Sequence, residues 1–303
     1  MGRLRVATRA STLARLQVAA VAAALDREVT EVVLSTLGDE RTVDPIHTLD
    51  PRGARGGVFV AEVQAAVLDG RADIAVHSAK DLASTTAEGL VLAAVPRRAD
   101  AADALVGARL RDLAAGARVG TGSVRRRAQL AWLRPDLTFG PLRGNIETRL
   151  DRPGSYGAVV VAAAALDRLG LSARVAERLD VAVVVPQAGQ GALAVECRAD
   201  DGATRRLLAS VDDPDARRAV TAERAFLAAL GAGCDSPVAA HATVDGSTVR
   251  LRASVASPDG RVLGTTEAEG VDPEALGAEV AGRLEAVGAW VLGPGALAPA
   301  GHG

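Results

Sequence analysis

The feature of this sequence that most constrains its fold is an alternation of short apolar runs with segments of helical periodicity. The apolar runs at residues 4–7, 32–34 and 73–76 have the length of buried strands. The segments between them, including residues 59–68, repeat apolar side chains at helical spacing. This alternation is typical of an α/β fold, in which helices connect the parallel strands of a sheet and cover its faces.

The first predicted helix and the loop that follows the second strand differ in their patterns. The helix is expected to bury one apolar face, formed by Leu13, Leu16, Ala20 and Ala23. Residues 38–57, by contrast, carry glycines and prolines without any apolar period. Because loops of this length inside compact domains are usually functional, we expect residues 38–57 to form a loop at a site.

The alternation continues through the middle of the chain. Apolar runs predict further strands at residues 90–95, 118–120, 137–139 and 158–161, with a helix over residues 123–133. A strand at residues 193–196 follows a Gly-Gln-Gly turn and is expected to return the chain to the first domain. These elements are enough for two α/β domains with largely parallel sheets.

The pattern changes after Pro214. A helix through Leu230 is followed by three alternating strands and an amphipathic helix, over residues 238–244, 248–254, 262–269 and 273–287. The predicted fold class is therefore α/β, with two α/β domains and a small C-terminal α+β domain. Their predicted bounds are 1–96 with 192–212, then 97–191, then 213–303.

Charge and cysteine usage exclude several function classes. The formal net charge of −2 gives no general attraction to nucleic acid or to an anionic membrane. No signal-peptide pattern opens the chain and no apolar segment is long enough to span a bilayer, so a cytoplasmic protein is expected. In that compartment Cys197 and Cys234 are expected to be free thiols, and their spacing predicts neither a disulfide nor a zinc site.

One strand is followed directly by a charged pair. Residues 73–81 read Asp-Ile-Ala-Val-His-Ser-Ala-Lys-Asp, and Lys80 is the only lysine among 35 basic residues. Two interpretations are open: a structural ion pair at a strand end, or a carboxylate that stays ionised and assists a reaction with a transient cation. In either interpretation His77 is taken as structural.

Arginines and small polar residues recur just after predicted strands, where ligands bind in open α/β sheets. The segments are Ala-Thr-Arg-Ala-Ser with Arg9 and Ser11, then Gly-Thr-Gly-Ser-Val-Arg-Arg with Thr121, Ser123, Arg125 and Arg126, then Leu-Arg-Gly-Asn with Arg143, and finally Arg149 and Arg168. Taken singly, each is compatible with a helix cap or a surface charge. Together they predict a site for several carboxylates, because each guanidinium can bind one bidentately; phosphates would also fit, although no Walker motif is present.

The two cysteines lie in different surroundings. Cys197 follows an apolar run and resembles an ordinary buried residue. Cys234 lies in a loop of small and polar residues, Gly-Ala-Gly-Cys-Asp-Ser-Pro, which displays the thiol. A displayed thiol can be a nucleophile, a redox sensor or an attachment point, and no base lies near it in the sequence.

In this order the motifs resemble the hydroxymethylbilane synthase (porphobilinogen deaminase) family. The resemblance runs from Arg5 to about Arg252 and rests also on Arg-Leu-Gly-Leu and Gly-Gln-Gly-Ala. It implies two domains folded like type II periplasmic binding proteins, an active site in the cleft between them, and a third domain. It also implies a transferase that condenses four porphobilinogen molecules head to tail, with loss of ammonia, onto a covalent dipyrromethane and then releases hydroxymethylbilane by hydrolysis.

The resemblance assigns roles to individual residues. It implies that Asp81 is the catalytic carboxylate and that Cys234 holds the dipyrromethane through a thioether. The residues implied to bind the cofactor are Ser78, Lys80, Thr121, Ser123, Arg125, Arg126, Arg143, Gly144 and Gln190. Those implied to bind substrate carboxylates are Arg9, Ser11, Arg149 and Arg168. No metal, nucleic acid or membrane partner is implied, and a monomer is expected.

Three segments depart from the family's pattern. The usual Lys-x-Gly-Gly-Lys-Gly-x-Phe reads Arg-Gly-Ala-Arg-Gly-Gly-Val-Phe at residues 52–59, so Gly56 stands at the second lysine position. The usual Lys-Asp-Val-Pro continues here with Leu82-Ala83, and Gly122 replaces a serine. None of these changes affects Asp81 or Cys234.

Two other function classes were compared with this one. A binding module for small anions, of the periplasmic-binding-protein type, would share the arginine cluster but would not need Lys80-Asp81 together with a loop thiol. A thiol-dependent hydrolase would need a histidine placed to activate Cys234, and no motif supplies one.

Overall fold

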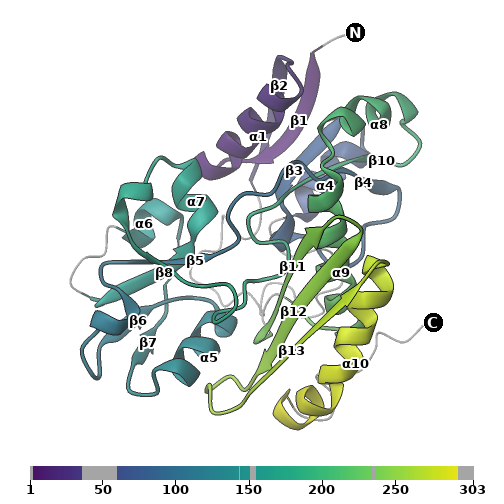
Figure 1. Ribbon diagram of the computed structural model, residues 1–303. Coiled ribbons are helices and arrows are strands. Elements are labelled where there is room, and N and C mark those ends of the chain that lie inside the picture. The colour runs from purple at the N-terminus through teal and green to yellow at the C-terminus, as the bar shows by residue number, and fades with distance from the viewer. Residues whose placement is uncertain (1–2, 36–59, 143, 151–154, 234–235, 293–303) are drawn as a thin grey trace. The chain divides into compact units, whose positions relative to one another are not determined.

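The computed structural model describes residues 3–35, 60–142, 144–150, 155–233 and 236–292, and the side chains of this part up to Glu285 (Figure 1). The chain divides into two compact units. The first comprises Met1–Ala99 with Gly191–Arg217, and the second comprises Asp100–Gln190 with Arg218–Gly303. Within the described residues, no helix is long and apolar enough to cross a membrane.

The first unit is built on a five-stranded sheet in the order β2-β1-β3-β10-β4. Its elements are β1 (Leu4–Arg9), α1 (Thr12–Ala24), β2 (Val29–Leu34), α4 (Ala61–Leu68), β3 (Ile74–Ser78), β4 (Leu90–Ala94), β10 (Leu193–Arg198) and α8 (Gly202–Leu208). Strands β1, β2 and β3 are parallel, whereas β10 runs antiparallel to β3 and β4. The predicted return of the chain to the first sheet at residues 193–196 is therefore confirmed.

The second unit contains a five-stranded sheet in the order β7-β6-β8-β5-β9. Its elements are β5 (Asp103–Val106), β6 (Arg118–Gly120), α5 (Val124–Leu133), β7 (Thr138–Gly140), α6 (Ile146–Leu150), β8 (Ala158–Ala162), α7 (Ala163–Arg168) and β9 (Val175–Arg178). Here β5 is the strand that runs antiparallel to its neighbours, β8 and β9.

The two sheets share one topology. In the first sheet the parallel strands β2, β1 and β3 lie next to each other, and the antiparallel strand β10 separates β3 from β4. In the second sheet β7, β6 and β8 are arranged in the same way, and the antiparallel strand β5 separates β8 from β9. That antiparallel strand is β10 in the first unit and β5 in the second, and each follows directly on the residues where the chain passes between the units. The sheets are thus mixed rather than fully parallel, because one strand of each comes from a chain crossing.

The remainder of the second unit is a three-stranded antiparallel sheet with helices. It consists of β11 (Val238–Asp245), β12 (Thr248–Ala256), β13 (Leu263–Gly270) and α10 (Pro273–Leu292), preceded by α9 (Pro214–Leu230), which begins in the first unit. Phe226 of α9 is fully buried in this core, which contributes about 1.5–3 kcal/mol. The predicted class, two α/β sheets followed by a small α+β part, is confirmed.

The expected buried face of the first helix is wrong. Helix α1 buries Ala14, Gln17, Val18 and Val21, whereas Leu16 is 38% exposed. Val18 and Val21 join the core formed with Val6 of β1 and Ile74 of β3. The same rotation turns Gln17 inward, where its Nε2 donates to Ser78 Oγ at 2.8 Å.

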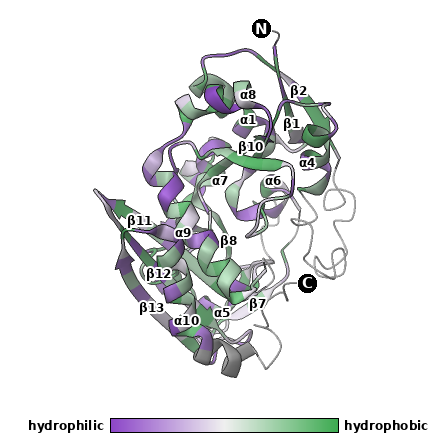
Figure 2. Ribbon diagram, turned by 90° about the vertical axis from the view of Figure 1, so that its right-hand side faces the viewer, coloured by the Kyte–Doolittle hydropathy of each residue, from purple (hydrophilic) through white to green (hydrophobic). Residues whose placement is uncertain are grey.

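Strand β10 lies in the interior of the first unit, and Figure 2 shows it as hydrophobic. Five of its six residues are buried, and Cys197 among them is fully inaccessible in the core cluster. Burial raises the pKa of the Cys197 thiol above its usual value. The prediction that Cys197 is an ordinary core residue is confirmed.

Candidate functional site

The carboxyl ends of β1 and β3 lie side by side in the first sheet. The two strands are parallel and pair in register at Val6 with Ile74 and Ala7 with Ala75. Parallel pairing brings the residues that follow each strand to the same edge. We name this group the carboxylate edge, and it consists of Arg9, Ser11, Ser78, Lys80 and Asp81.

Ser11 and Ser78 each have a structural contact at this edge. Ser11 is the N-cap of α1, because its Oγ accepts a hydrogen bond from Ala14 N at 3.2 Å. Ser78 Oγ accepts from Gln17, so α1 and the end of β3 are tied together. Both hydroxyls keep a proton to donate, so these contacts do not conflict with ligand binding.

Asp81 lies in a short 3-10 turn, Ala79–Asp81, that follows β3 directly. The turn is fixed at its start, where Ala79 N donates to Ala192 O at 3.0 Å. Asp81 is half-buried, and its carboxylate makes no hydrogen bond or ion pair with any residue that the structure describes. The structural ion pair between Lys80 and Asp81, one of the two interpretations, is therefore not formed in this conformation.

A buried polar group lies next to the carboxylate edge on β3. His77 Nε2 is 3.2 Å from Glu196 Oε2 of β10, and both side chains are almost completely buried. Gln64 of α4 donates to the same Glu196 oxygen at 2.9 Å. This group connects α4, β3 and β10, which agrees with the structural role expected for His77.

The corresponding edge of the second sheet begins at the Gly-Thr-Gly-Ser turn after β6. Thr121 is buried, and its Oγ1 accepts a hydrogen bond from Ser123 N at 3.1 Å. Ser123 is the N-cap of α5, and its Oγ accepts from Arg126 N at 3.4 Å. The turn thus begins the helix that carries Arg125 and Arg126.

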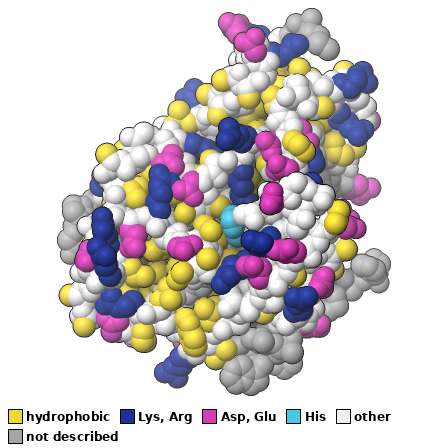
Figure 3. All heavy atoms as spheres, viewed as in Figure 1, with side chains coloured by type: hydrophobic (Ala, Val, Ile, Leu, Met, Phe, Trp, Pro, Cys, Tyr) yellow, Lys and Arg dark blue, Asp and Glu magenta, His cyan; other side chains and the backbone are white. Residues whose placement is uncertain are grey.

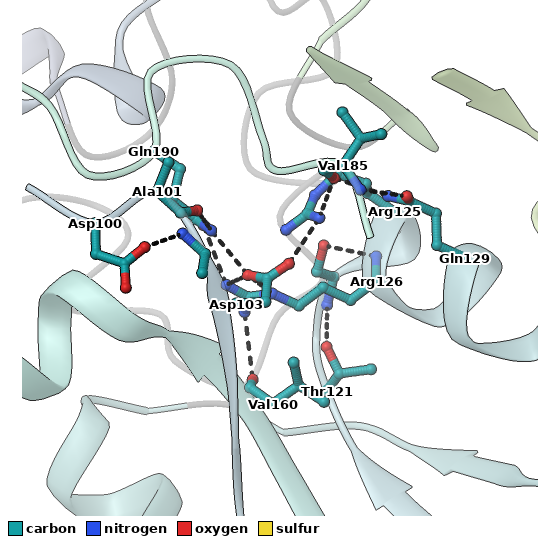
Figure 4. Close-up of polar contacts among 12 residues, drawn as sticks. Asp100, Ala101, Asp103, Thr121, Arg125, Arg126, Gln129, Val160, Val185 and Gln190 are labelled. Atoms are coloured by element: carbon teal, nitrogen blue, oxygen red, sulfur yellow. Dashed lines mark hydrogen bonds and ion pairs between the residues drawn. The ribbon is translucent and has the colours of Figure 1, made fainter. Parts of the chain in front are cut away.

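Arg125 and Arg126 do not point into solvent; they converge on Asp103, the first residue of β5 (Figure 4). Asp103 is fully buried, and its two carboxylate oxygens lie 2.8 Å from Arg125 Nη1 and 2.8 Å from Arg126 Nη2. Gln190 Nε2 also donates to Asp103, at 2.9 Å, and Gln190 Oε1 accepts from Arg126 Nη2 at 3.2 Å. We name Asp103, Arg125, Arg126 and Gln190 the arginine network.

The arginine network strongly favours the ionised form of Asp103. Burial alone would raise the pKa of Asp103, but the guanidinium groups of Arg125 and Arg126 outweigh it and hold that pKa well below its usual range. Burial also lowers the pKa of Arg125. Each arginine has a further contact with a backbone carbonyl: Arg125 Nη1 donates to Val185 O at 2.8 Å, and Arg126 Nη1 to Val160 O at 3.3 Å.

One edge of the Arg125 guanidinium is left without a partner. Its Nε and Nη2 atoms are buried and make no hydrogen bond within the described part of the chain. These two nitrogens form the side of a guanidinium that binds a carboxylate bidentately. Arg125 therefore pairs with Asp103 through Nη1, while its Nε and Nη2 edge has no partner among the described residues.

The sequence analysis did not identify Asp103. It predicted that Gln190 binds the cofactor, and in the structure Gln190 forms hydrogen bonds with Arg126 and Asp103. The available signal for Asp103 was a single carboxylate inside an apolar run, Ala-Ala-Asp-Ala-Leu-Val at residues 101–106. A buried acid of this kind requires a cationic partner. Two arginines in the following helix would have been the candidates.

The remaining predicted site residues of the second unit are partly described. Gly144 has φ of +101°, which favours glycine, and its carbonyl accepts from Arg149 Nε at 2.7 Å. Arg168 ends α7, and burial lowers its pKa. The predictions for Arg143, Cys234, the loop at residues 38–57 and the motif at residues 52–59 lie outside the described residues.

Charges of opposite sign are interspersed on the surface. On the face shown in Figure 3, Lys and Arg side chains lie among Asp and Glu side chains rather than forming one basic patch. Several are exposed pairs, such as Arg178 with Asp167 at 2.6 Å and Arg250 with Glu269 at 2.5 Å. In the interior of the second unit, by contrast, Arg125 and Arg126 lie together against one carboxylate, that of Asp103.

Two family models match the chain. The model described as porphobilinogen deaminase, dipyromethane cofactor binding domain, matches residues 4–206. The model described as porphobilinogen deaminase, C-terminal domain, matches residues 217–286. Together they contain both sheets, the carboxylate edge and the arginine network.

Curated relatives agree with these models. The porphobilinogen deaminase of Acidothermus cellulolyticus is 52% identical over 249 residues, which cover 78% of this chain and 74% of that protein. The porphobilinogen deaminase of Brevibacillus brevis is 42% identical over 302 residues, covering 95% and 96% of the two chains. A solved Salmonella typhimurium periplasmic binding protein is 14% identical, covers 69% of this chain and 92% of its own, and has a TM-score of 0.37. Such a low score supports no argument, but from the two family models and the curated relatives the chain belongs to the porphobilinogen deaminase family.

Proposed function

We propose that this chain joins four porphobilinogen molecules head to tail, releases one ammonia for each, and delivers the linear tetrapyrrole hydroxymethylbilane. The observation that carries the proposal is the half-buried Asp81 at the end of β3, which has no partner among the described residues, in a chain whose family is established over most of its length. We further propose that the protein acts as a cytoplasmic monomer.

The residues present fit a dipyrromethane cofactor. Its acidic side chains need cationic partners, and Arg125 offers a buried guanidinium edge without one. Arg125 and Arg126 would hold these carboxylates together with Arg143, while Ser78, Lys80, Thr121, Ser123, Gly144 and Gln190 would complete the polar surroundings, and Cys234 would form the thioether. When bound, the cofactor supplies the pyrrole carbon to which the first substrate unit is joined.

The role proposed for Asp81 follows from its surroundings. Porphobilinogen becomes a cation when ammonia leaves, and an ionised carboxylate about 4 Å away stabilises a unit positive charge by about 4 kcal/mol at an effective dielectric constant of 20. Asp81 is not neutralised by an ion pair within the described residues, so its charge can act on the substrate. The same carboxylate can accept the proton that the pyrrole ring loses when the new bond forms.

Four further residues are proposed to bind substrate carboxylates. Arg9 and Ser11 at the carboxylate edge, and Arg149 and Arg168 in the second unit, would bind the acetate and propionate groups of porphobilinogen. Each pyrrole carries two carboxylates, so the substrate and the growing chain are highly anionic. Bidentate contacts with arginine are among the strongest hydrogen bonds that a protein makes to carboxylates.

Intact mass tests the proposed attachment. The purified protein should weigh more than its chain by one dipyrromethane, and Cys234→Ser should abolish that excess. Cys197→Ser is the matched control, because Cys197 is buried in the core of the first sheet, and this variant should keep the added mass. An unchanged mass excess in Cys234→Ser would refute the attachment site.

Turnover distinguishes the proposal from a small-anion binding module. Incubation with porphobilinogen should release four molecules of ammonia for each hydroxymethylbilane formed. Porphobilinogen binding without ammonia release would support the binding module instead.

A further inference from the structure

Asp103 is the least accessible charged group in the arginine network. It is 0% exposed, and its neighbours in the sequence are the buried apolar residues Ala102 and Ala104. A lone ionised carboxylate in such surroundings is strongly unfavourable unless it is paired and hydrogen-bonded. Here its partners are Arg125 and Arg126 of α5 and Gln190, which lies shortly before β10.

The charges within the network do not balance. Two guanidinium groups face one carboxylate, and Gln190 is neutral. One positive charge is therefore in excess within a buried group, which attracts an anion from outside the network. The excess of one positive charge exists because Asp103 is the single acid of the network. A second acid in the network would cancel the excess, and loss of Asp103 would raise it to two positive charges.

The contacts also decide which guanidinium edge remains open. Arg126 presents Nε and Nη2 to Asp103 Oδ1, both at 2.8 Å, so its bidentate edge is occupied. Arg125 reaches Asp103 and Val185 O with Nη1 alone, and its Nε and Nη2 have no hydrogen-bond partner in the described ranges of the chain. Asp103 thus orients Arg125 so that one complete bidentate edge remains for a single carboxylate.

We propose that Asp103 is a positioning residue of the cofactor site, which fixes Arg126, turns the open edge of Arg125 toward one cofactor carboxylate and sets the excess charge that attracts it. This inference rests on the proposed function, in which that carboxylate belongs to the dipyrromethane. A purely structural ion pair is the alternative, because buried pairs of this type also occur where they serve folding alone.

The variant Asp103→Asn tests the inference because it keeps the size of the side chain and removes its charge. We expect folded Asp103→Asn to carry the dipyrromethane mass in at least fivefold less of the protein than wild type, after equal exposure to porphobilinogen. In the loaded fraction, KM for porphobilinogen should rise more than kcat falls. Asp136→Asn is the matched control, since Asp136 pairs with Arg134 at the surface of the same unit, and its loading should equal that of wild type.

Equal loading and equal KM in folded Asp103→Asn would overturn the inference and leave Asp103 as a structural ion pair. If Asp103→Asn does not fold, Asp103→Glu decides, because it keeps the charge but moves the carboxylate by one methylene. Reduced loading of folded Asp103→Glu supports a positioning role, and loading equal to wild type overturns it. A wild-type protein without dipyrromethane mass would instead contradict the proposed function itself.

Discussion

The two five-stranded sheets have the same strand order, yet the ends of their strands carry charge in opposite ways. At the carboxylate edge, Asp81 is half-buried and no described residue pairs with it. In the arginine network, Asp103 is fully buried and contacts two arginines and a glutamine. One topology therefore holds both a half-buried acid without a described partner and a fully buried acid paired with two arginines.

This difference predicts how each region responds to mutation. Removing a group with few internal contacts costs little folding free energy, so a change of Asp81 should affect rate and leave stability nearly unchanged. Removing part of a buried group of ion pairs and hydrogen bonds, such as the arginine network, costs stability as well as function. The following predictions test this contrast.

The largest effect is expected for Asp81→Asn. The amide keeps the shape of the side chain but loses the charge and the ability to accept a proton, so turnover of porphobilinogen should fall by about 10²- to 10⁴-fold. The free energy of unfolding should change by less than about 0.5 kcal/mol, as for a group without internal partners. Steady-state kinetics and urea denaturation measure the two quantities.

Glu88→Gln is the control for Asp81→Asn. Glu88 is an exposed acid of the same unit, so neither rate nor stability should change. Near-wild-type turnover in Asp81→Asn would show that Asp81 is not the catalytic carboxylate. A large loss of stability would show instead that Asp81 has internal partners, and the contrast between the two regions would fail.

The next largest effect is expected where the turn between β12 and β13 of the C-terminal sheet packs against α5. Gly260, in the turn between β12 and β13, has φ of +73°, and a Cβ there would lie 2.6 Å from Ala128 O and 2.6 Å from Ala131 Cβ on α5. Arg127 of α5 also donates to Pro258 O at 2.9 Å. We expect Gly260→Ala to destabilise the protein by about 2–5 kcal/mol, through overpacking and backbone strain together.

Gly246→Ala separates these two causes. Gly246 also has positive φ, +55°, but a Cβ there would meet nothing within 4 Å. It should therefore show the strain alone, about 1–2 kcal/mol. Urea denaturation of both variants gives the difference, and equal losses would mean that the turn does not pack on α5. Because α5 carries Arg125 and Arg126, Gly260→Ala should also lower cofactor loading, whereas Gly246→Ala should not.

The strand and helix pattern of the sequence predicted most of this fold because buried strands and amphipathic helices leave local signals. Strands β5 and β9 were missed, since each has four residues and β9 is only half-buried at a sheet edge. The face of α1 was wrong because apolar residues lie all around this helix, so its pattern does not decide which side faces the sheet. Tertiary packing decides such cases, and a single sequence does not contain it.

The candidate site was predicted unevenly for a similar reason. Arg125 and Arg126 were found from a local turn-and-helix motif, but their partner Asp103 lies more than 20 residues earlier in the chain. The order of strands brings β5 beside β8, and only that pairing places Asp103 at the start of α5. Long-range contacts of this type depend on topology, so the network could not be derived from local patterns.

A smaller effect is expected for Gly122→Ser, which restores the serine usual in the family. A Cβ at Gly122 would lie 2.7 Å from Leu142 O, so the backbone at Leu142 must move. We expect a loss of about 1–3 kcal/mol in stability from this overpacking. Urea denaturation measures it, and unchanged or increased stability would show that the segment at Leu142 adapts without cost.

The smallest effect is expected for Tyr156→Phe. The Tyr156 hydroxyl donates to Pro141 O at 2.7 Å and so holds the segment that leads to Leu142 and Gly144. Phenylalanine keeps the ring that packs on Gly120 and lies 5.2 Å from the Arg118 guanidinium, so only the hydrogen bond is lost. Because the bond is exposed to solvent, stability should fall by only about 0.5–1 kcal/mol. If urea denaturation shows this loss and cofactor loading also falls, the segment after β7 contributes to cofactor binding together with the arginine network. If stability falls and loading does not, the Tyr156 hydroxyl stabilises only the second sheet.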